Sequence, residues 1–236
     1  ADIHAMYDLS LRWAARYGRL DVVEYLLQNN ANINAMNTEA LLNAVENKHI
    51  DVVQYLLEHG ADMHVNNNST LMWAIQNGHI PIVEYIVQNG ENIPGEKVLI
   101  LAIQSRQLGV IQCLVQNDVD INVLNNYSSA LTYAINHGQL HIAKYLIKSG
   151  ANVNYGSDRP LRIAARYGYL DIVIYLCNHG ADITHGNYLA VYNSILNGHL
   201  EIVKYLYSIH VDAEYPFINN DLIQAELNKI YEVLEK

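Results

Sequence analysis

The sequence is poor in residues on which several classes of protein depend. It has two cysteines among 236 residues, too few for the disulfide framework of a small secreted protein. No apolar stretch approaches the roughly 20 residues that a membrane-spanning helix requires. Lysine and arginine number 14 against 24 aspartates and glutamates, a balance opposite to that of most nucleic-acid-binding proteins. We therefore expect no membrane partner, no nucleic-acid partner, and a reducing intracellular location, cytoplasmic or nuclear.

The motifs of catalysis and of cofactor binding are missing as well. The sequence has no glycine-rich phosphate-binding motif and no Cys-x-x-Cys pair. His137 and His141 have the spacing of two zinc ligands on one helix, but Gly138 interrupts that helix and no glutamate follows the first histidine. No set of nucleophile, base and oxyanion donor can be recognised. We therefore expect a protein that is not an enzyme and has no cofactor and no metal site.

What the sequence does contain is an internal repeat, with a period of about 30 residues that is typical of solenoid proteins. Seven segments share the pattern of Leu20-Asp-Val-Val-Glu-Tyr-Leu-Leu27. One position holds tyrosine in six segments and cysteine in the fourth: Tyr25, Tyr55, Tyr85, Cys113, Tyr145, Tyr175 and Tyr205. The interval between successive members is constant, except that it is shorter before Cys113 and longer after it. The apolar residues of each segment fall at helical spacing, Val22 and Val23 among them in the first, so each unit predicts two short helices.

Small residues recur at fixed places within the units. One position of the first helix is always small, which a close approach between helices explains: Ala14, Ala44, Ala74, Ala102, Ala134, Ala164 and Ser194. Glycine recurs in the turn between the two helices, at Gly18, Gly78, Gly138, Gly168 and Gly198. A second set should end the second helix in a left-handed conformation: Gly60, Gly90, Gly150 and Gly180.

On these residues, and on closing phrases such as Gly60-Ala-Asp-Met-His64, residues 1–213 resemble the ankyrin repeat family. The resemblance implies an all-α solenoid of about seven helix-turn-helix units. The units are shorter than the roughly 33 residues typical of the family, so we expect short or absent β-fingers. The family's characteristic histidine is replaced, by Arg12 and Arg162 among others, which puts its hydrogen bonds between repeats in question. The spacing and the Val-Val-x-Tyr-Leu-Leu motif narrow the resemblance to ankyrin proteins of large DNA viruses.

The two ends of the repeat array differ. Residues 1–5 match the tail of a repeat, so the array opens mid-repeat and we expect the chain to be a segment of a longer protein. Residues 214–236 contain an amphipathic pattern that predicts a capping helix of the same solenoid, and a docking helix for a partner is the alternative. Repeat 4 has Arg106 and Asp118 where other units have glycine, and we predict it to be the least stable unit.

A partner-binding surface is predicted where residues vary against a repeating background, just before the turn between the helices. In the ankyrin family the corresponding residues line the concave face and contact targets. Repeats 1 and 6 share the phrase Leu-Arg-x-Ala-Ala-Arg-Tyr-Gly, which predicts binding anchors, although solvated charges are the alternative. The candidate residues are Arg12, Arg16, Tyr17, Glu46, Asn47, Gln76, Asn77, Gln104, Asn136, His137, Arg162, Arg166 and Tyr167.

The resemblance implies a protein–protein interaction module, either an adaptor or an inhibitor, which binds a partner protein on its concave face. We expect the module itself to be a monomer, and a viral origin would make the partner a regulatory protein of the host cell. The alternative is a passive structural scaffold that joins assemblies. A saturable one-to-one complex would favour the interaction module, whereas higher-order assembly would favour the scaffold.

Overall fold

The computed structural model describes residues 4–90, 93–122, 124–125 and 128–211. The chain divides into two compact units, Ala1–Asp120 and Ile121–Lys236, and each is described by itself below. The division falls after repeat 4. The predicted capping or docking helix at residues 214–236 lies outside the described residues.

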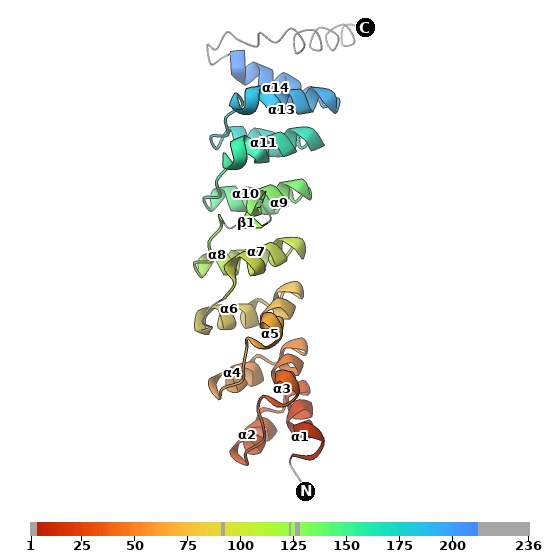
Figure 1. Cartoon of the computed structure of the whole chain (residues 1–236), viewed down its shortest axis with the longest axis vertical. Coiled ribbons are helices and arrows are strands. Elements are labelled where there is room, and N and C mark those ends of the chain that lie inside the picture. The colour runs from red at the N-terminus through yellow and green to blue at the C-terminus, as the bar shows by residue number, and fades with distance from the viewer. Residues whose placement is uncertain (1–3, 91–92, 123, 126–127, 212–236) are drawn as a thin grey trace. The chain divides into compact units, whose positions relative to one another are not determined.

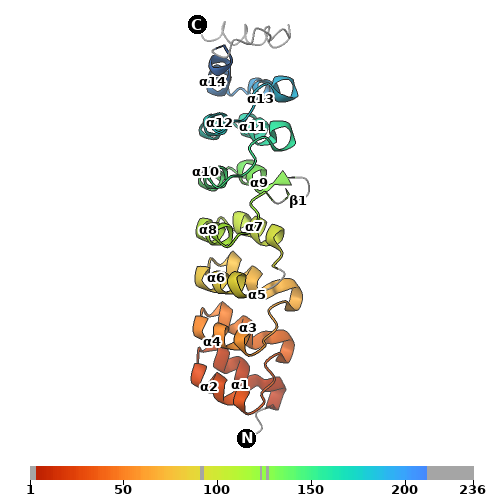
Figure 2. The same cartoon turned by 90° about the vertical axis from the view of Figure 1, so that its left-hand side faces the viewer.

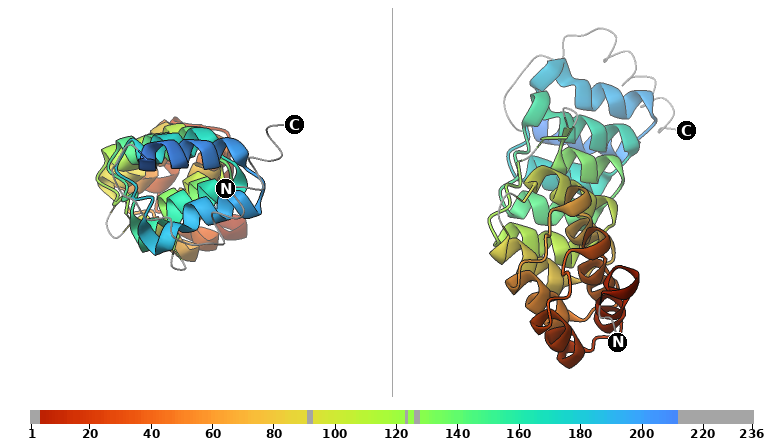
Figure 3. Two further views of the ribbon diagram at one scale, coloured as in Figure 1. Left: turned by 90° about the horizontal axis from the view of Figure 1, so that it is seen from above. Right: turned by 60° about the horizontal axis from the view of Figure 1, so that its bottom comes forward.

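Unit 1 consists of four helix pairs, one pair for each of repeats 1 to 4. The first helices pack in one row and are α1 (Ala5–Arg16), α3 (Ala35–Glu46), α5 (Val65–Gln76) and α7 (Gly95–Gln104). The second helices pack in a second row and are α2 (Leu20–Gln28), α4 (Ile50–Glu58), α6 (Ile80–Asn89) and α8 (Leu108–Gln116). Figures 1 and 2 show both rows in red to yellow, and Figure 3 shows them in two further views.

Unit 2 repeats the arrangement for repeats 5 to 7. Its first helices are α9 (Ala130–Asn136), α11 (Tyr155–Tyr167) and α13 (His185–Leu196). Its second helices are α10 (Leu140–Lys148), α12 (Leu170–Cys177) and α14 (Leu200–Val211). A short hairpin ladder, β1 (Leu124–Asn125) with β2 (Ser128–Ser129), precedes α9. The predicted all-α fold of helix pairs is thus confirmed.

The core of each unit lies between its two rows of helices. The recurring small position is buried in every repeat, from Ala14 at 6% exposure to Ser194 at 0%, as a close helix–helix approach requires. In the second helices the paired apolar residues are buried, for example Val52 and Val53. Val22 is the exception at 40% exposure, although it takes the same place in its segment as the buried Val52. Among the described residues no second helix precedes α2 to cover it.

The glycine predictions are confirmed with one correction. Every glycine between paired helices has a positive φ, and so do Lys48 and Arg106, which take the same place in repeats 2 and 4. At the ends of the second helices Gly60, Gly150 and Gly180 are left-handed, with φ of 91° to 94°. Gly90 instead has φ −89° and ψ 139°, so the prediction of a left-handed end is wrong there. Repeat 3 ends differently because the chain between its second helix and the next repeat is shorter than elsewhere.

The length of chain between repeats decides how each first helix begins. At the standard interval the chain turns through residues with positive φ, such as Met36, Asn37 and Thr38, which replace the β-finger. The longer interval after Cys113 leaves room for the β1–β2 hairpin before α9. In the shorter interval before Cys113 no described residue between α6 and α7 has a positive φ, and α7 starts directly after Pro94. The expected short or absent β-fingers are therefore confirmed.

Polar side chains tie several of these turns to the next repeat. A left-handed conformation costs roughly 1–2 kcal/mol for a residue other than glycine, so these turns need support. The backbone N–H of Asn32 donates to the buried Asp8 carboxylate over 3.1 Å, and the backbone N–H of Asp182 donates to the Asp158 carboxylate over 2.9 Å. Asn34 makes a two-sided version of this link, accepting from the Asp62 amide and donating to the Gly60 carbonyl.

Other residues make hydrogen bonds between repeats in place of the missing family histidine. The Asn43 and Asn193 side chains donate to the carbonyls of Arg12 and Arg162 in the preceding first helix. His49 Nε2 lies 3.1 Å from the Arg16 carbonyl oxygen, and His199 lies 3.0 Å from that of Arg166. The bonds from the histidines satisfy carbonyls at helix ends that have no partner within their own helix.

His79 is a buried histidine whose titration should affect the stability of unit 1. Its ring lies 5.1 Å from that of Trp73, and Nε2 has no hydrogen-bond partner among the described residues. Burial, and next the charge of Lys48, lower the pKa of His79 below its usual 6.5. The unfolded chain therefore binds this proton more readily, so the free energy of unfolding should fall as the pH drops below 6.5. Urea unfolding at about pH 7.5 and about pH 5.5 should show a larger loss for the natural protein than for His79→Gln.

The matched control for this prediction is His141→Gln, because His141 is exposed on α10. Its pH dependence should follow that of the natural protein. Equal pH dependence of His79→Gln and the natural protein would show that His79 does not contribute.

Candidate partner-binding site

The residues predicted to bind a partner lie at or near the C-terminal ends of the first helices. In unit 1 these helices are neighbours, so their ends form one row of exposed side chains. The row contains Arg16, Tyr17, Glu46, Asn47, Gln76, Asn77 and Gln104. In unit 2 the exposed members are Asn136, His137, Arg166 and Tyr167. Arg12 and Arg162 lie one turn earlier in their helices and are half-buried.

Three of the predicted residues also serve their own helix. The side-chain amide of Asn47 donates to the Asn43 carbonyl over 2.8 Å, and that of Asn77 donates to the Trp73 carbonyl over 2.9 Å. His137 Nδ1 lies 2.9 Å from the Tyr133 carbonyl oxygen, and the two rings stack. These side chains cap carbonyls at the end of a helix, which by itself explains their residue types. The side chains of Gln76 and Gln104 make no such capping bond among the described residues, and the Gln76 carbonyl accepts from the Gln107 side chain.

Arg12 of repeat 1 faces a carboxylate of the same unit. Arg12 Nη1 donates to Glu39 Oε2 over 2.6 Å, and Nη2 donates to the Met6 carbonyl over 2.9 Å. Only 12% of the Arg12 side chain is exposed in this ion pair. The charge of Arg12 is therefore largely neutralised within the protein.

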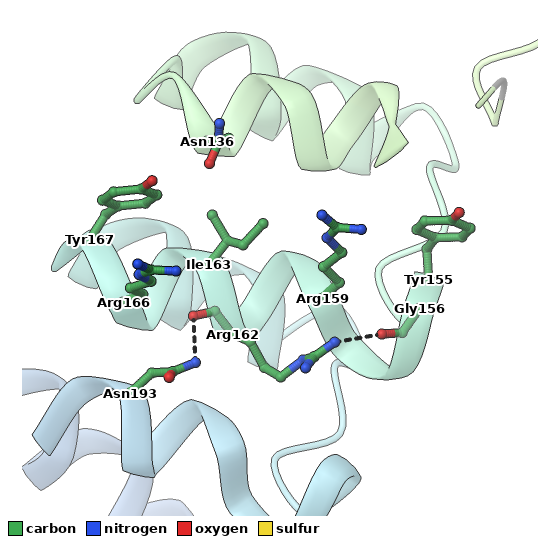
Figure 4. Close-up of a pocket in the computed structure, with 9 residues that line it drawn as sticks. All are labelled: Asn136, Tyr155, Gly156, Arg159, Arg162, Ile163, Arg166, Tyr167 and Asn193. Carbon is green, nitrogen blue, oxygen red and sulfur yellow. Dashed lines mark hydrogen bonds between the residues drawn. The ribbon is translucent and has the colours of Figure 1, made fainter. Parts of the chain in front are cut away.

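The arginines of repeat 6 line a groove of about 600 Å³ in unit 2. Figure 4 shows Tyr155 and Tyr167 at opposite ends of α11, Ile163 pointing toward α9, and Asn136 of α9 pointing back. The full lining is Asn136, Tyr155, Gly156, Arg159, Arg162, Ile163, Arg166, Tyr167 and Asn193. Three guanidinium groups thus lie in one groove that no carboxylate lines.

The shared phrase of repeats 1 and 6 has different surroundings in the two units. Arg162 repeats one contact of Arg12, because its Nη2 donates to the Gly156 carbonyl over 2.8 Å. The residue at the same sequence distance from Arg162 as Glu39 is from Arg12 is Leu189, which has no charge. Among the described residues Arg162 has no carboxylate partner, and the buried Nε atoms of Arg12 and Arg162 both lack a hydrogen bond. Repeat 6 therefore keeps a positive charge that repeat 1 neutralises.

Sequence reasoning found four of the groove residues and missed the others. Arg159 lies three residues before Arg162 and seven before Arg166, so the helical period could have placed all three on one stripe. Tyr155 could not be found in this way. It precedes Gly156, Ser157 and Asp158, which have φ of 61°, 57° and 55°, so the helical period does not run through to it.

Within the described residues, no three histidine, cysteine, aspartate or glutamate side chains gather in a way that could hold a metal ion. Burial raises the pKa of the Cys177 thiol to about 12 and also raises that of Cys113, so neither thiol forms a nucleophilic thiolate at neutral pH. No helix in this part of the chain is long and apolar enough to cross a membrane. The groove offers guanidinium hydrogen-bond donors and tyrosine rings, and both kinds of group can bind a ligand.

Comparison with known families decides the identity of the fold. The family model described as ankyrin repeats matches residues 11–97, 71–157, 99–187 and 156–220. The chain belongs to the ankyrin repeat family. Ankyrin repeat domains mediate protein–protein interactions and are typically not enzymes, and their partners are proteins.

Solved structures of other ankyrin repeat proteins share this fold. The chain is similar to the ankyrin repeat domain of human ASB11, with 22% identity, a TM-score of 0.65, and coverage of 88% of this chain and 98% of that domain. It is also similar to the ankyrin repeat domain of Bcl-3, a member of the IkappaB family, with 20% identity, a TM-score of 0.71, and coverage of 82% and 97%. No curated protein matches the sequence with significance. The narrower resemblance to viral ankyrin proteins stays a prediction.

Proposed function

We propose that this ankyrin repeat protein is an adaptor or inhibitor module that binds its partner through the ends of its first helices. In the ankyrin family the corresponding surface is the concave face. The row of exposed, varying side chains on a repeating scaffold supports this proposal. Residues such as Glu46 and Gln76 differ from repeat to repeat while the buried alanines beside them do not. A surface that recognises one partner needs such variation, because specificity comes from the arrangement of different groups.

The proposal includes an intracellular site of action for a monomeric module. Two unpaired cysteines fit a reducing compartment. The viral resemblance would make the partner a regulatory protein of the host cell. The module would then act by occupying that protein or by bringing it to another one.

Photo-crosslinking tests which surface meets the partner. A photo-reactive amino acid at Gln76 or Asn136 should capture a partner protein from an extract of the protein's native cells, because both residues are exposed at first-helix ends. Capture should be much weaker from Gln28 or Lys148, which are exposed on second helices. Mass spectrometry identifies the captured protein, and ultracentrifugation of the purified pair should show a saturable one-to-one complex.

Two results would count against this function. Equal capture of the same protein from all four positions would place the binding surface elsewhere. Assembly into particles of increasing size, without a saturable complex, would favour a passive scaffold.

A further inference from the structure

The groove of unit 2 is an unusual place in an acidic protein. The chain as a whole has a formal net charge of −10 and only 14 lysines and arginines. Three of those arginines, Arg159, Arg162 and Arg166, line one groove of about 600 Å³. This concentration of positive charge runs against the charge of the rest of the molecule. A local field of this kind selects for a negatively charged ligand at this position.

The helices around the groove are also depleted of carboxylates. Helices α9, α11 and α13 together contain one acidic residue, Asp158. Its side chain is 1% exposed and accepts a hydrogen bond from the Asp182 amide in the next repeat. The acidic group nearest in sequence is therefore buried and engaged in holding the turn. Among the described residues Arg162 and Arg166 have no carboxylate partner.

Unit 1 provides an internal comparison for the same helix. There, Glu39 of α3 pairs with Arg12 at 2.6 Å, which neutralises the charge of the guanidinium from within the chain. In unit 2 the equivalent residue of α13 is Leu189. A carboxylate from outside the chain can therefore take the role at Arg162 that Glu39 takes at Arg12. The Glu39 contact shows which chemistry this arginine position accepts.

The spacing of the arginines suggests the form of the ligand. Arg162 and Arg166 are one helical turn apart along α11, a rise of about 6 Å. Alternate residues of an extended peptide are about 6.6 Å apart and point to the same side. Two carboxylates separated by one residue thus match the two arginines. Tyr155 and Tyr167 at the two ends of α11 offer aromatic surface to the flanking residues.

We propose that the groove of unit 2 binds an extended acidic segment of the partner protein, with carboxylates at alternate residues paired to Arg162 and Arg166. Arg159 adds positive charge on the same stripe of α11. Arginine suits this role because its planar group can pair with a carboxylate through two parallel hydrogen bonds. This inference rests on the proposed function and specifies the chemistry of the partner. Nucleic acid is the less favoured polyanion, since most of its length would meet an acidic protein.

Fluorescence anisotropy with three labelled octapeptides tests the proposal on the full chain. Peptides of repeating Glu-Ala, Gln-Ala and Glu-Glu-Ala-Ala separate charge from spacing, since the first and third have equal charge. The alternating glutamate peptide should bind most tightly, and its affinity should fall with added salt. Equal binding of the glutamine peptide, or tighter binding of a labelled oligothymidine of equal length, would overturn the proposal.

Variants of the groove give the second test. Arg162→Ala with Arg166→Ala should weaken binding of the alternating peptide by about tenfold or more, the loss of one to two charge-assisted hydrogen bonds. Leu189→Glu should weaken it to a similar extent, because it supplies Arg162 with the carboxylate that Arg12 has in unit 1. The matched control is Lys148→Ala with Lys204→Ala, which removes two exposed cations from second helices of unit 2 and should leave the affinity within about twofold. Unchanged binding in both groove variants, or an equal loss in the control, would refute the assignment.

The same variants distinguish a failure of this inference from a failure of the proposed function. If the partner captured through Asn136 still binds the Arg162→Ala, Arg166→Ala protein unchanged, the groove assignment is wrong and the interaction module stands. If no first-helix position captures a partner, the proposed function fails, whatever the peptides do. Unchanged urea unfolding of Leu189→Glu confirms that its loss of binding does not come from misfolding.

Discussion

Replacing Leu146 with alanine should lower the free energy of unfolding by about 2–5 kcal/mol. Leu146 lies in α10 with no exposed surface, and the truncation leaves a cavity that the packed helices can fill only in part. In a repeat array the stability is roughly a sum of repeat and interface terms, so the loss is felt in repeat 5 and in its neighbours. Urea unfolding followed by circular dichroism measures the change.

The control for Leu146→Ala is Lys148→Ala, slightly further along the same helix. Lys148 is exposed, so its loss should change the free energy of unfolding by no more than about 0.5 kcal/mol. A loss below about 1 kcal/mol for Leu146→Ala would mean that the two rows of helices are not packed as described.

Enlarging the recurring small position should be almost as damaging. Ala74 lies in α5 with no exposed surface, facing neighbours that approach closely because its side chain is one methyl group. We expect Ala74→Leu to lower the free energy of unfolding by about 1–3 kcal/mol, since the extra atoms force neighbouring helices apart. The midpoint of urea unfolding should fall accordingly.

A natural substitution in the chain supplies the control for Ala74→Leu. Ser194 takes the same position in repeat 7, fully buried, and its hydroxyl donates to the Val191 carbonyl over 2.7 Å. Ala74→Ser should therefore be tolerated far better than Ala74→Leu, because the hydroxyl finds a partner within its own helix. Equal effects of serine and leucine would show that polarity, and not size, limits this position.

The two stability predictions concern buried surfaces of the helices, whereas the groove inference concerns an exposed one. The buried side of each first helix must be nearly constant, as the alanines show, because every repeat meets a neighbour of the same kind. The ends of the first helices carry no such constraint. Contacts on the exposed side can therefore vary from repeat to repeat, as those of Arg12 and Arg162 do, without a change in the scaffold.

The pattern of residue types does not by itself decide which contacts a side chain makes. Val22 has the residue type of a core position, but burial also requires a covering neighbour, and no described helix provides one. Asn47 and Asn77 lie where variable polar residues predict recognition, and their side-chain amides also cap their own helices. Local pattern reports what a residue can do, whereas contacts decide which of its roles is used.

The sequence by itself determined the repeat, the helix pairs, the buried small residues and most of the left-handed glycines, because each follows from a period or from the conformational needs of one residue. Tertiary structure alone decided how the two copies of the arginine phrase differ. The partner of Arg12 comes from the next repeat, and Tyr155 reaches the groove only through a left-handed turn. Those facts depend on which side chains packing brings together, and no local pattern carries that information.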